Sequence, residues 1–233
     1  FTPTDVATET SHPQWLVDRI TEQFGAEAAA EFCRYNNTKW QISIQTNTLL
    51  TSRDELKKKL EESGVVTEPG RYDFATLVVH SLPKGKRLHE LEPYLLGHFQ
   101  IQEESASLIA KLSPPIPGQL VIDLCSAPGG KSVNLACLMQ GKGRILAIDP
   151  SSKRLDIVRE NIARQKIPNV ELVEGDGRTF HSPTLADLVL VDAPCSGFGV
   201  LGRKADARWH KEPDEPERLH ALQLELLDNA AKL

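Results

Sequence analysis

The sequence has few of the residues that hold metal centres or disulfide-stapled folds together. Its four cysteines are scattered, and none lies at Cys-x-x-Cys spacing; they are Cys33, Cys125, Cys137 and Cys195. Zinc sites and small secreted folds need closely patterned cysteines, so we expect neither a metal site nor a disulfide framework. This cysteine usage is typical of a reduced, cytoplasmic protein.

Long apolar runs and an excess of positive charge are also missing. No run reaches membrane-spanning length and no signal peptide is visible, so we expect no membrane contact. The net charge is −5, which means that nucleic-acid binding must depend on a local basic patch. The hydrophobic share of 40% is nevertheless enough for a globular core.

The first half of the chain predicts two short helices and a small mixed domain. Residues 1–10 are expected to form an extended arm, followed by helices over 14–24 and 26–36. We expect three parts: a helical segment 1–37, a small α+β domain 38–95, and a Rossmann-like domain 96–233.

The small domain is predicted from strand and cap signals. Alternating residues over 40–47 favour a strand, and Ser52 with Glu55 forms a capping box that starts a helix. Strands are expected at 65–67 and 75–79. The order β-α-β-β indicates a split βαβ module, a type that often presents a sheet face to RNA. We expect residues 93–102 to be a connector.

From residue 119 onward, strand and helix patterns alternate. Strands are predicted at 120–124, 144–148, 170–173 and 188–191, with helices at 103–112, 132–139 and 153–163. Near-continuous Val, Ile and Leu runs favour a parallel sheet covered on both faces, so the fold class is α/β. Each strand ends in or beside an aspartate, and ligands of such sheets bind at the carboxyl ends of the strands.

The first of these strands leads into a glycine turn for which there are two interpretations: a phosphate loop and a nucleoside-cofactor site. Gly130-Lys131-Ser132 ends like a phosphate loop, but Cys125 stands where the first glycine of that motif belongs. Pro128 also removes an N–H donor from the loop that must wrap the phosphates. A nucleotide hydrolase therefore remains an alternative.

The second reading is a nucleoside cofactor without a pyrophosphate. Asp149 ends the second strand, where a Rossmann-like domain holds the ribose hydroxyls, and Asp176 follows the third strand near the expected adenine. The G-x-G-x-x-G fingerprint of NAD-binding proteins is absent. Carboxylates at the strand ends attract a positive ligand, which favours S-adenosylmethionine.

A cysteine follows the fourth strand in the segment Asp192-Ala193-Pro194-Cys195. Carbon 5 of cytosine is a poor nucleophile, and a thiolate that adds to carbon 6 makes it able to attack a methyl group. A lone cysteine is otherwise a small buried hydrophobe. The base must be reachable, which favours unpaired RNA or a flipped nucleotide.

The segments 123–131 and 192–197 closely resemble the RNA cytosine-5 methyltransferases. The N-terminal half, with Ser11-His12-Pro13, is similar to the methyltransferase B-like bacterial branch, which modifies 16S ribosomal RNA. This resemblance implies an enzyme that uses S-adenosylmethionine to methylate carbon 5 of a cytosine in RNA. Ribosomal RNA is then the expected partner.

The resemblance also implies a role for each matching residue. Asp149 holds the ribose, Asp176 the adenine side, and Asp192 lies between cofactor and base, with Lys131 near the reacting groups. The residues expected to line the methionine part are Cys125, Ser126, Ala127, Pro128, Gly129, Gly130 and Lys131. We expect a basic patch of Arg203, Lys204 and Arg208 to contact the RNA backbone.

The sequence departs from the family in one respect. The family carries two cysteines: the one in the Pro-Cys motif, here Cys195, helps to release the product, and the attacking thiolate lies in a later Thr-Cys motif. No Thr-Cys pair occurs here, and the only methionine is Met139. We therefore expect a fragment that binds cofactor but does not methylate RNA alone. A non-catalytic, RNA-binding ribosome-assembly factor is a further alternative.

Overall fold

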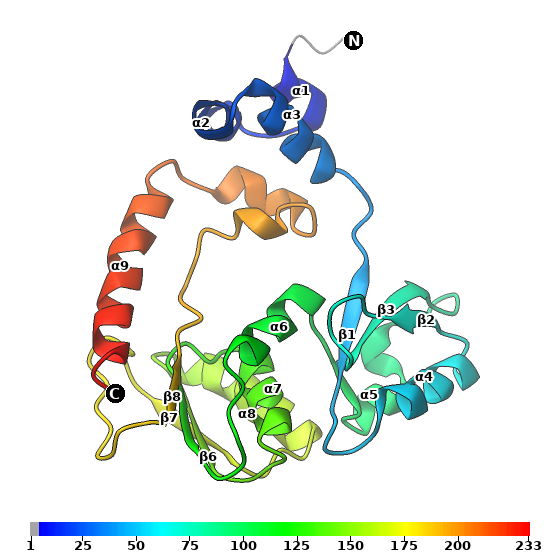
Figure 1. The fold of residues 1–233 in the computed structure, drawn as a ribbon. Coiled ribbons are helices and arrows are strands. Elements are labelled where there is room, and N and C mark those ends of the chain that lie inside the picture. Colours follow the sequence, from blue (N-terminus) through cyan, green and yellow to red (C-terminus); the bar gives the residue numbers. More distant parts are fainter. Residues whose placement is uncertain (1–4) are drawn as a thin grey trace. The chain divides into compact units, whose positions relative to one another are not determined.

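The computed structural model describes residues 5–233, which divide into two compact units (Figure 1). One unit combines the described chain up to Trp40 with Pro194–Gln223, and the other combines Gln41–Ala193 with Leu224–Leu233. Helix α9 (Glu215–Ala230) begins in the first unit and ends in the second. Within the described residues, no helix is long and apolar enough to cross a lipid bilayer.

The first unit is helical. It contains α1 (Val6–Thr10), α2 (Gln14–Phe24), α3 (Ala26–Tyr35) and the 3₁₀ helices η2 (Phe198–Val200) and η3 (Ala205–His210). The helices expected at 14–24 and 26–36 are confirmed. The extended arm is wrong for residues 6–10, because Asp5 caps α1 by accepting a hydrogen bond from the Thr8 N–H at 2.7 Å. Residues 1–4 of that predicted arm lie outside the described residues.

The second unit begins with an antiparallel sheet in the strand order β2-β3-β1-β4. Its elements are β1 (Ile42–Thr46), α4 (Arg53–Glu62), β2 (Val66–Pro69), β3 (Thr76–Ser81), η1 (Leu88–Glu90), α5 (Glu92–Leu95) and β4 (Phe99–Ile101). The predicted capping box is present, since Ser52 and Glu55 each accept a hydrogen bond from the other's backbone N–H. The core of this layer is formed by Ile44, Leu56, Leu60, Leu77 and Phe99.

The connector expected at 93–102 is wrong. Residues of this segment form α5 and then β4, which pairs with β1 in the register Thr46↔Phe99 and Gln45↔Gln100. The sheet therefore continues past residue 95, and Gln100 becomes part of a layer that packs beside the later domain.

The rest of the second unit is a parallel sheet in the order β7-β6-β5-β8, the expected Rossmann-like arrangement. Its elements are α6 (Glu104–Leu112), β5 (Leu120–Asp123), α7 (Gly130–Leu138), β6 (Arg144–Asp149), α8 (Ser152–Arg164), β7 (Val170–Glu174) and β8 (Leu188–Leu190).

Successive residues of β5 and β6 serve opposite faces of this sheet. Val121 and Ile145 pack in one cluster with Leu135 and Met139 at the α7 side, whereas Ile122 packs in another cluster. That second cluster includes Leu124, Leu146, Ile148 and Leu233. Strands β7 and β8 lie at the two edges of this sheet.

Candidate functional site

The turn after β5 is fixed by hydrogen bonds to the neighbouring strand. The Ser126 N–H donates to the Ile148 carbonyl at 2.9 Å, and the Gly129 N–H donates to the Ser126 carbonyl at 2.7 Å. Gly129 has φ +99°, and a Cβ there would lie 3.0 Å from Cγ1 of Val158. Only glycine suits this conformation, and it lets the turn lie directly against α8.

Asp149 sits at the carboxyl end of the next strand and is 1% exposed. Its Oδ1 accepts a hydrogen bond from the Ser151 N–H at 2.9 Å. Its Oδ2 lies 3.2 Å from Nη1 of Arg154, at ion-pair distance, but accepts no hydrogen bond. A buried carboxylate oxygen without a hydrogen-bond donor has acceptor capacity for a ligand hydroxyl, as a ribose offers.

Three carboxylates act electrostatically on the thiol of Cys125, the first residue of the turn segment. Burial raises the pKa of Cys125 to about 11, and the charges of Asp123, Asp149 and Asp192 add to this effect. The thiol is therefore protonated at neutral pH and is no nucleophile. The same negative field favours a positively charged ligand above the turn.

Asp123 is fully buried beneath the turn. Its Oδ2 accepts a hydrogen bond from the Ser132 hydroxyl at 2.7 Å, yet burial raises its pKa to about 6. Ionisation of a carboxyl this deeply buried costs the folded state stability, and such costs are common at functional sites.

The structure brings Lys131 and Asp192 together. Lys131 Nζ lies 2.5 Å from Oδ2 of Asp192, joining the start of α7 to the segment after β8. The side chain of Asp192 is 47% exposed and that of Lys131 is 18% exposed. This ion pair holds a carboxylate at the carboxyl end of the sheet, beside the turn.

Asp176 is engaged by its own neighbour. Arg178 binds both carboxylate oxygens, with Nη2 at 2.6 Å from Oδ2, and its hydrogen bonds lower the pKa of Asp176. The role of Asp176 beside an adenine stays a prediction, and a ligand amino group there must share an oxygen with Arg178.

Cys195 belongs to the first compact unit and is exposed. Its neighbour Pro194 accepts a hydrogen bond through its carbonyl from the Gln223 amide at 2.8 Å. A thiol in this position is open to a reactant from solvent.

The basic patch expected at 203–208 is wrong for Arg208. This side chain is 3% exposed and donates to the Asn36 carbonyl at 2.9 Å and to Oδ1 of Asn37 at 2.8 Å. Its guanidinium fastens η3 to the N-terminal helices instead of facing solvent. Lys204 is exposed, and Arg203 lies 5.9 Å from the ring of Trp40.

Sequence reasoning missed the residues that support the turn from the first sheet. The Gln100 amide donates to the Gly130 carbonyl and to Oδ1 of Asn134, both at 2.9 Å, and Asn134 donates to Oε1 of Gln102 at 2.8 Å. Gln100 is only 7% exposed. A glutamine in a presumed connector carried no signal that could have revealed this contact.

Two family models match parts of this chain. A family model described as 16S rRNA methyltransferase RsmB/F matches residues 110–233, more than half of the chain. A second model, described as the RsmF/B-like ferredoxin-like domain, matches residues 12–81.

Two curated relatives match nearly all of this chain. It is 36% identical over 232 residues to the probable ribosomal RNA small subunit methyltransferase B of Bacillus subtilis, covering 98% of this chain and 51% of that protein. It is 35% identical to a 28S rRNA (cytosine-C(5))-methyltransferase of Mus musculus, covering 97% of this chain and 28% of that protein. The chain thus spans about half the length of the first relative and little more than a quarter of the second.

Solved structures share the fold. The crystal structure of PH0851 has a TM-score of 0.91 at 31% identity and covers 100% of this chain and 54% of that one. A methyltransferase homolog from Pyrococcus horikoshii has a TM-score of 0.84 at 26% identity, covering 100% of this chain and 73% of that one. From the family model, the glycine turn and the parallel sheet together, we conclude that the chain belongs to the 16S rRNA methyltransferase RsmB/F family.

Proposed function

We propose that this chain holds the S-adenosylmethionine whose methyl group is transferred to carbon 5 of a cytosine in ribosomal RNA; the thiolate of the family's Thr-Cys motif, which attacks the cytosine, is not among its residues. The observation that carries the cofactor part of the proposal is the buried Oδ2 of Asp149, which accepts no hydrogen bond and lies at the carboxyl end of β6. The relatives named as ribosomal RNA methyltransferases support the RNA substrate. They do not favour a nucleotide hydrolase or a non-catalytic assembly factor.

The residues of the turn segment, 125–131, bind the methionine part of the cofactor, and Asp149 accepts hydrogen bonds from the ribose. Asp176 contacts the adenine side. When bound, S-adenosylmethionine supplies a methyl group on a positively charged sulfur. The carboxylates around Cys125 stabilise that charge and orient the cofactor.

The ion pair of Lys131 and Asp192 positions the group that meets the target base. Asp192 lies between cofactor and base, and its contact with Lys131 limits how it turns. Cys195 assists release of the methylated base, consistent with its exposed thiol. Arg203 and Lys204 contact the RNA backbone.

We also propose a functional division into a helical segment 1–37, a small domain 38–95 whose sheet is completed by β4 from beyond residue 95, and a methyltransferase domain 96–233. The small domain and the helical segment present RNA, while the methyltransferase domain holds the cofactor. The separate family models for residues 12–81 and 110–233 support a division of this kind.

Calorimetric titration of the 233-residue chain separates this proposal from the phosphate-loop alternative. S-adenosylmethionine is expected to bind one site, and ATP with magnesium is expected to give no binding heat at that site. Binding of ATP but not S-adenosylmethionine would contradict the proposal and restore the hydrolase.

A further inference from the structure

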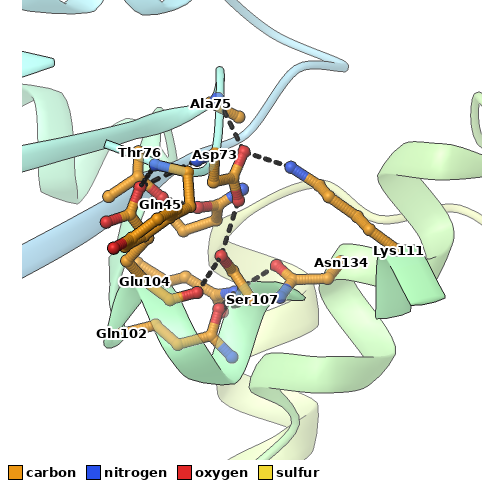
Figure 2. A network of polar contacts seen from close by, with 11 residues as sticks. Gln45, Asp73, Ala75, Thr76, Gln102, Glu104, Ser107, Lys111 and Asn134 are labelled. Atoms are coloured by element: carbon orange, nitrogen blue, oxygen red, sulfur yellow. Dashed lines mark hydrogen bonds and ion pairs between the residues drawn. The ribbon is translucent and has the colours of Figure 1, made fainter. Parts of the chain in front are cut away.

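The loop between β2 and β3 is held rigidly by the start of α6. Oε1 of Glu104 accepts hydrogen bonds from the Tyr72 N–H at 2.6 Å and from the Asp73 N–H at 2.8 Å. The loop closes on itself because the Thr76 N–H donates to the Asp73 carbonyl at 3.1 Å. Figure 2 shows α6 residues converging on this loop.

Asp73 is the buried anchor of the loop, at 2% exposure. Its carboxylate accepts hydrogen bonds from the Ala75 N–H at 2.8 Å, from the Ser107 hydroxyl at 2.5 Å and from the ammonium of Lys111 (Figure 2). Burial alone raises the pKa of Asp73. The hydrogen bonds from Lys111 and Ser107 lower that pKa by more than burial raises it, so the net shift is downward. The charge of the anchor is therefore compensated.

Two aromatic rings flank this anchor and face solvent. Tyr72 is 66% exposed and Phe74 is 67% exposed, one on each side of Asp73 in the sequence. Cζ of Arg71 lies 5.1 Å from the centre of the Tyr72 ring, and Nζ of Lys111 lies 4.3 Å from that of Phe74. Each exposed ring therefore carries a cation at its face.

Isolated exposed hydrophobic residues are common and need no explanation. Here the backbone of the loop is held by hydrogen bonds and the carboxylate of Asp73 is buried, whereas the rings of Tyr72 and Phe74 face solvent. The two rings therefore contribute little to the core. Rigid aromatic faces beside cations are the elements with which proteins stack unpaired bases and meet their phosphates. Arg71 is exposed and lies over the Tyr72 ring, where its charge is available to a phosphate.

We propose that Tyr72 and Phe74 form a base-stacking platform for single-stranded RNA, with Arg71 contacting the adjacent phosphate. This rests on the proposed function, because it takes RNA as the substrate. The platform binds bases by their faces, so it has little sequence preference. It supplies affinity from the small domain and does not take part in the chemistry.

The test measures RNA binding by the 233-residue chain with fluorescence anisotropy. The probes are a fluorescein-labelled oligocytidylate of about twelve nucleotides and an abasic strand of the same length. The wild-type chain is expected to prefer the strand with bases by roughly tenfold or more. The double variant Tyr72→Leu/Phe74→Leu keeps exposed apolar side chains but removes both rings, and it is expected to lose this preference.

Two controls separate stacking from damage to the fold. Phe24→Leu makes the same chemical change at another exposed ring, 70% exposed, in the first compact unit, and is expected to keep the preference. Tyr72→Trp/Phe74→Trp is expected to keep or increase it, because larger rings stack on bases at least as well.

The results also separate this inference from the proposed function. If the double Leu variant still prefers the strand with bases over the abasic strand, the platform is overturned even though the chain binds RNA. The two exposed rings would then be candidates for contact with a protein partner. A wild-type chain that binds neither strand would overturn both the platform and the RNA part of the proposed function. Binding of S-adenosylmethionine is expected to be unchanged in every variant.

Discussion

The side-chain amide of Gln100 donates a hydrogen bond to the carbonyl oxygen of Gly130, with the two atoms 2.9 Å apart. Gln100 lies on β4 of the antiparallel sheet, and Gly130 is the first residue of α7. The position of the turn therefore depends on a layer that precedes it by about thirty residues of sequence.

Replacement of Gln100 by Met is expected to weaken binding of S-adenosylmethionine by roughly three- to tenfold. The variant keeps the length of the side chain but removes the hydrogen bonds that Gln100 donates to the Gly130 carbonyl and to Oδ1 of Asn134, at a cost of about 1–3 kcal/mol. Calorimetry gives the affinity and thermal unfolding gives the stability. Unchanged cofactor affinity in the presence of lowered stability would show that Gln100 is only structural.

Replacement of Asp149 by Asn is expected to reduce the affinity for S-adenosylmethionine by about tenfold or more, because a charged acceptor to ribose hydroxyls is lost. Asp156→Asn removes a carboxylate from the solvent-exposed side of α8 and serves as the matched control. If Asp149→Asn and Asp156→Asn both bind the cofactor with wild-type affinity, the proposed role of Asp149 in binding the ribose is contradicted.

The buried carboxyl of Asp123 predicts a pH dependence of stability. Its pKa is raised from 3.8 to about 6 in the folded chain, so between these values the folded state binds more protons than the unfolded state. Stability contributed by the protonated form is full below about pH 4 and is lost as the pH rises through about 6. Ionisation of Asp123 then costs the folded state roughly 3 kcal/mol at neutral pH.

Asp123→Asn is therefore expected to raise the free energy of unfolding at about pH 7.5 by up to roughly 3 kcal/mol, and by less at about pH 5. Urea unfolding of both proteins at the two pH values measures the difference. An equal difference at both pH values would contradict a raised pKa of this group.

Arg208 and Lys204 are expected to respond differently to substitution. Arg208→Ala removes a buried donor from the Asn36 carbonyl and the Asn37 side chain, so it should lower stability by about 2–4 kcal/mol. Lys204→Ala should leave stability unchanged and reduce the salt dependence of RNA binding by roughly one phosphate contact. The opposite result would contradict both assignments: an Arg208→Ala variant that is as stable as the wild type but has an altered salt dependence of RNA binding, while Lys204→Ala leaves that salt dependence unchanged.

The parallel sheet could be predicted from sequence because its strands are nearly continuous runs of Val, Ile and Leu. The turn could be predicted as well, since Gly129 and Gly130 interrupt that pattern where a strand ends. Strand β4 could not, because the alternation of Phe99-Gln100-Ile101 is only three residues long, too short to predict a strand, and the segment becomes one by pairing with β1. Such pairing is a long-range property that local patterns do not contain.

The candidate site shows the same limit at the level of side chains. The position of Asp149 at the end of the second parallel strand is predictable, because Rossmann-like domains place an acidic residue there at a regular spacing after the glycine turn. The burial of Arg208 is not predictable from sequence. An arginine in a basic stretch is expected to face solvent unless its hydrogen-bond partners, such as the Asn36 carbonyl, are known. Gln100 was missed for the same reason: its acceptor on Gly130 is brought to it only by the packing of two layers.

The most direct test of the proposed function is bisulfite sequencing of ribosomal RNA from cells that lack the gene. We predict that one cytosine loses its methylation, that the wild-type gene restores it, and that a gene carrying Asp149→Ala does not. Unchanged 5-methylcytosine in the ribosomal RNA of the deletion strain would contradict the account.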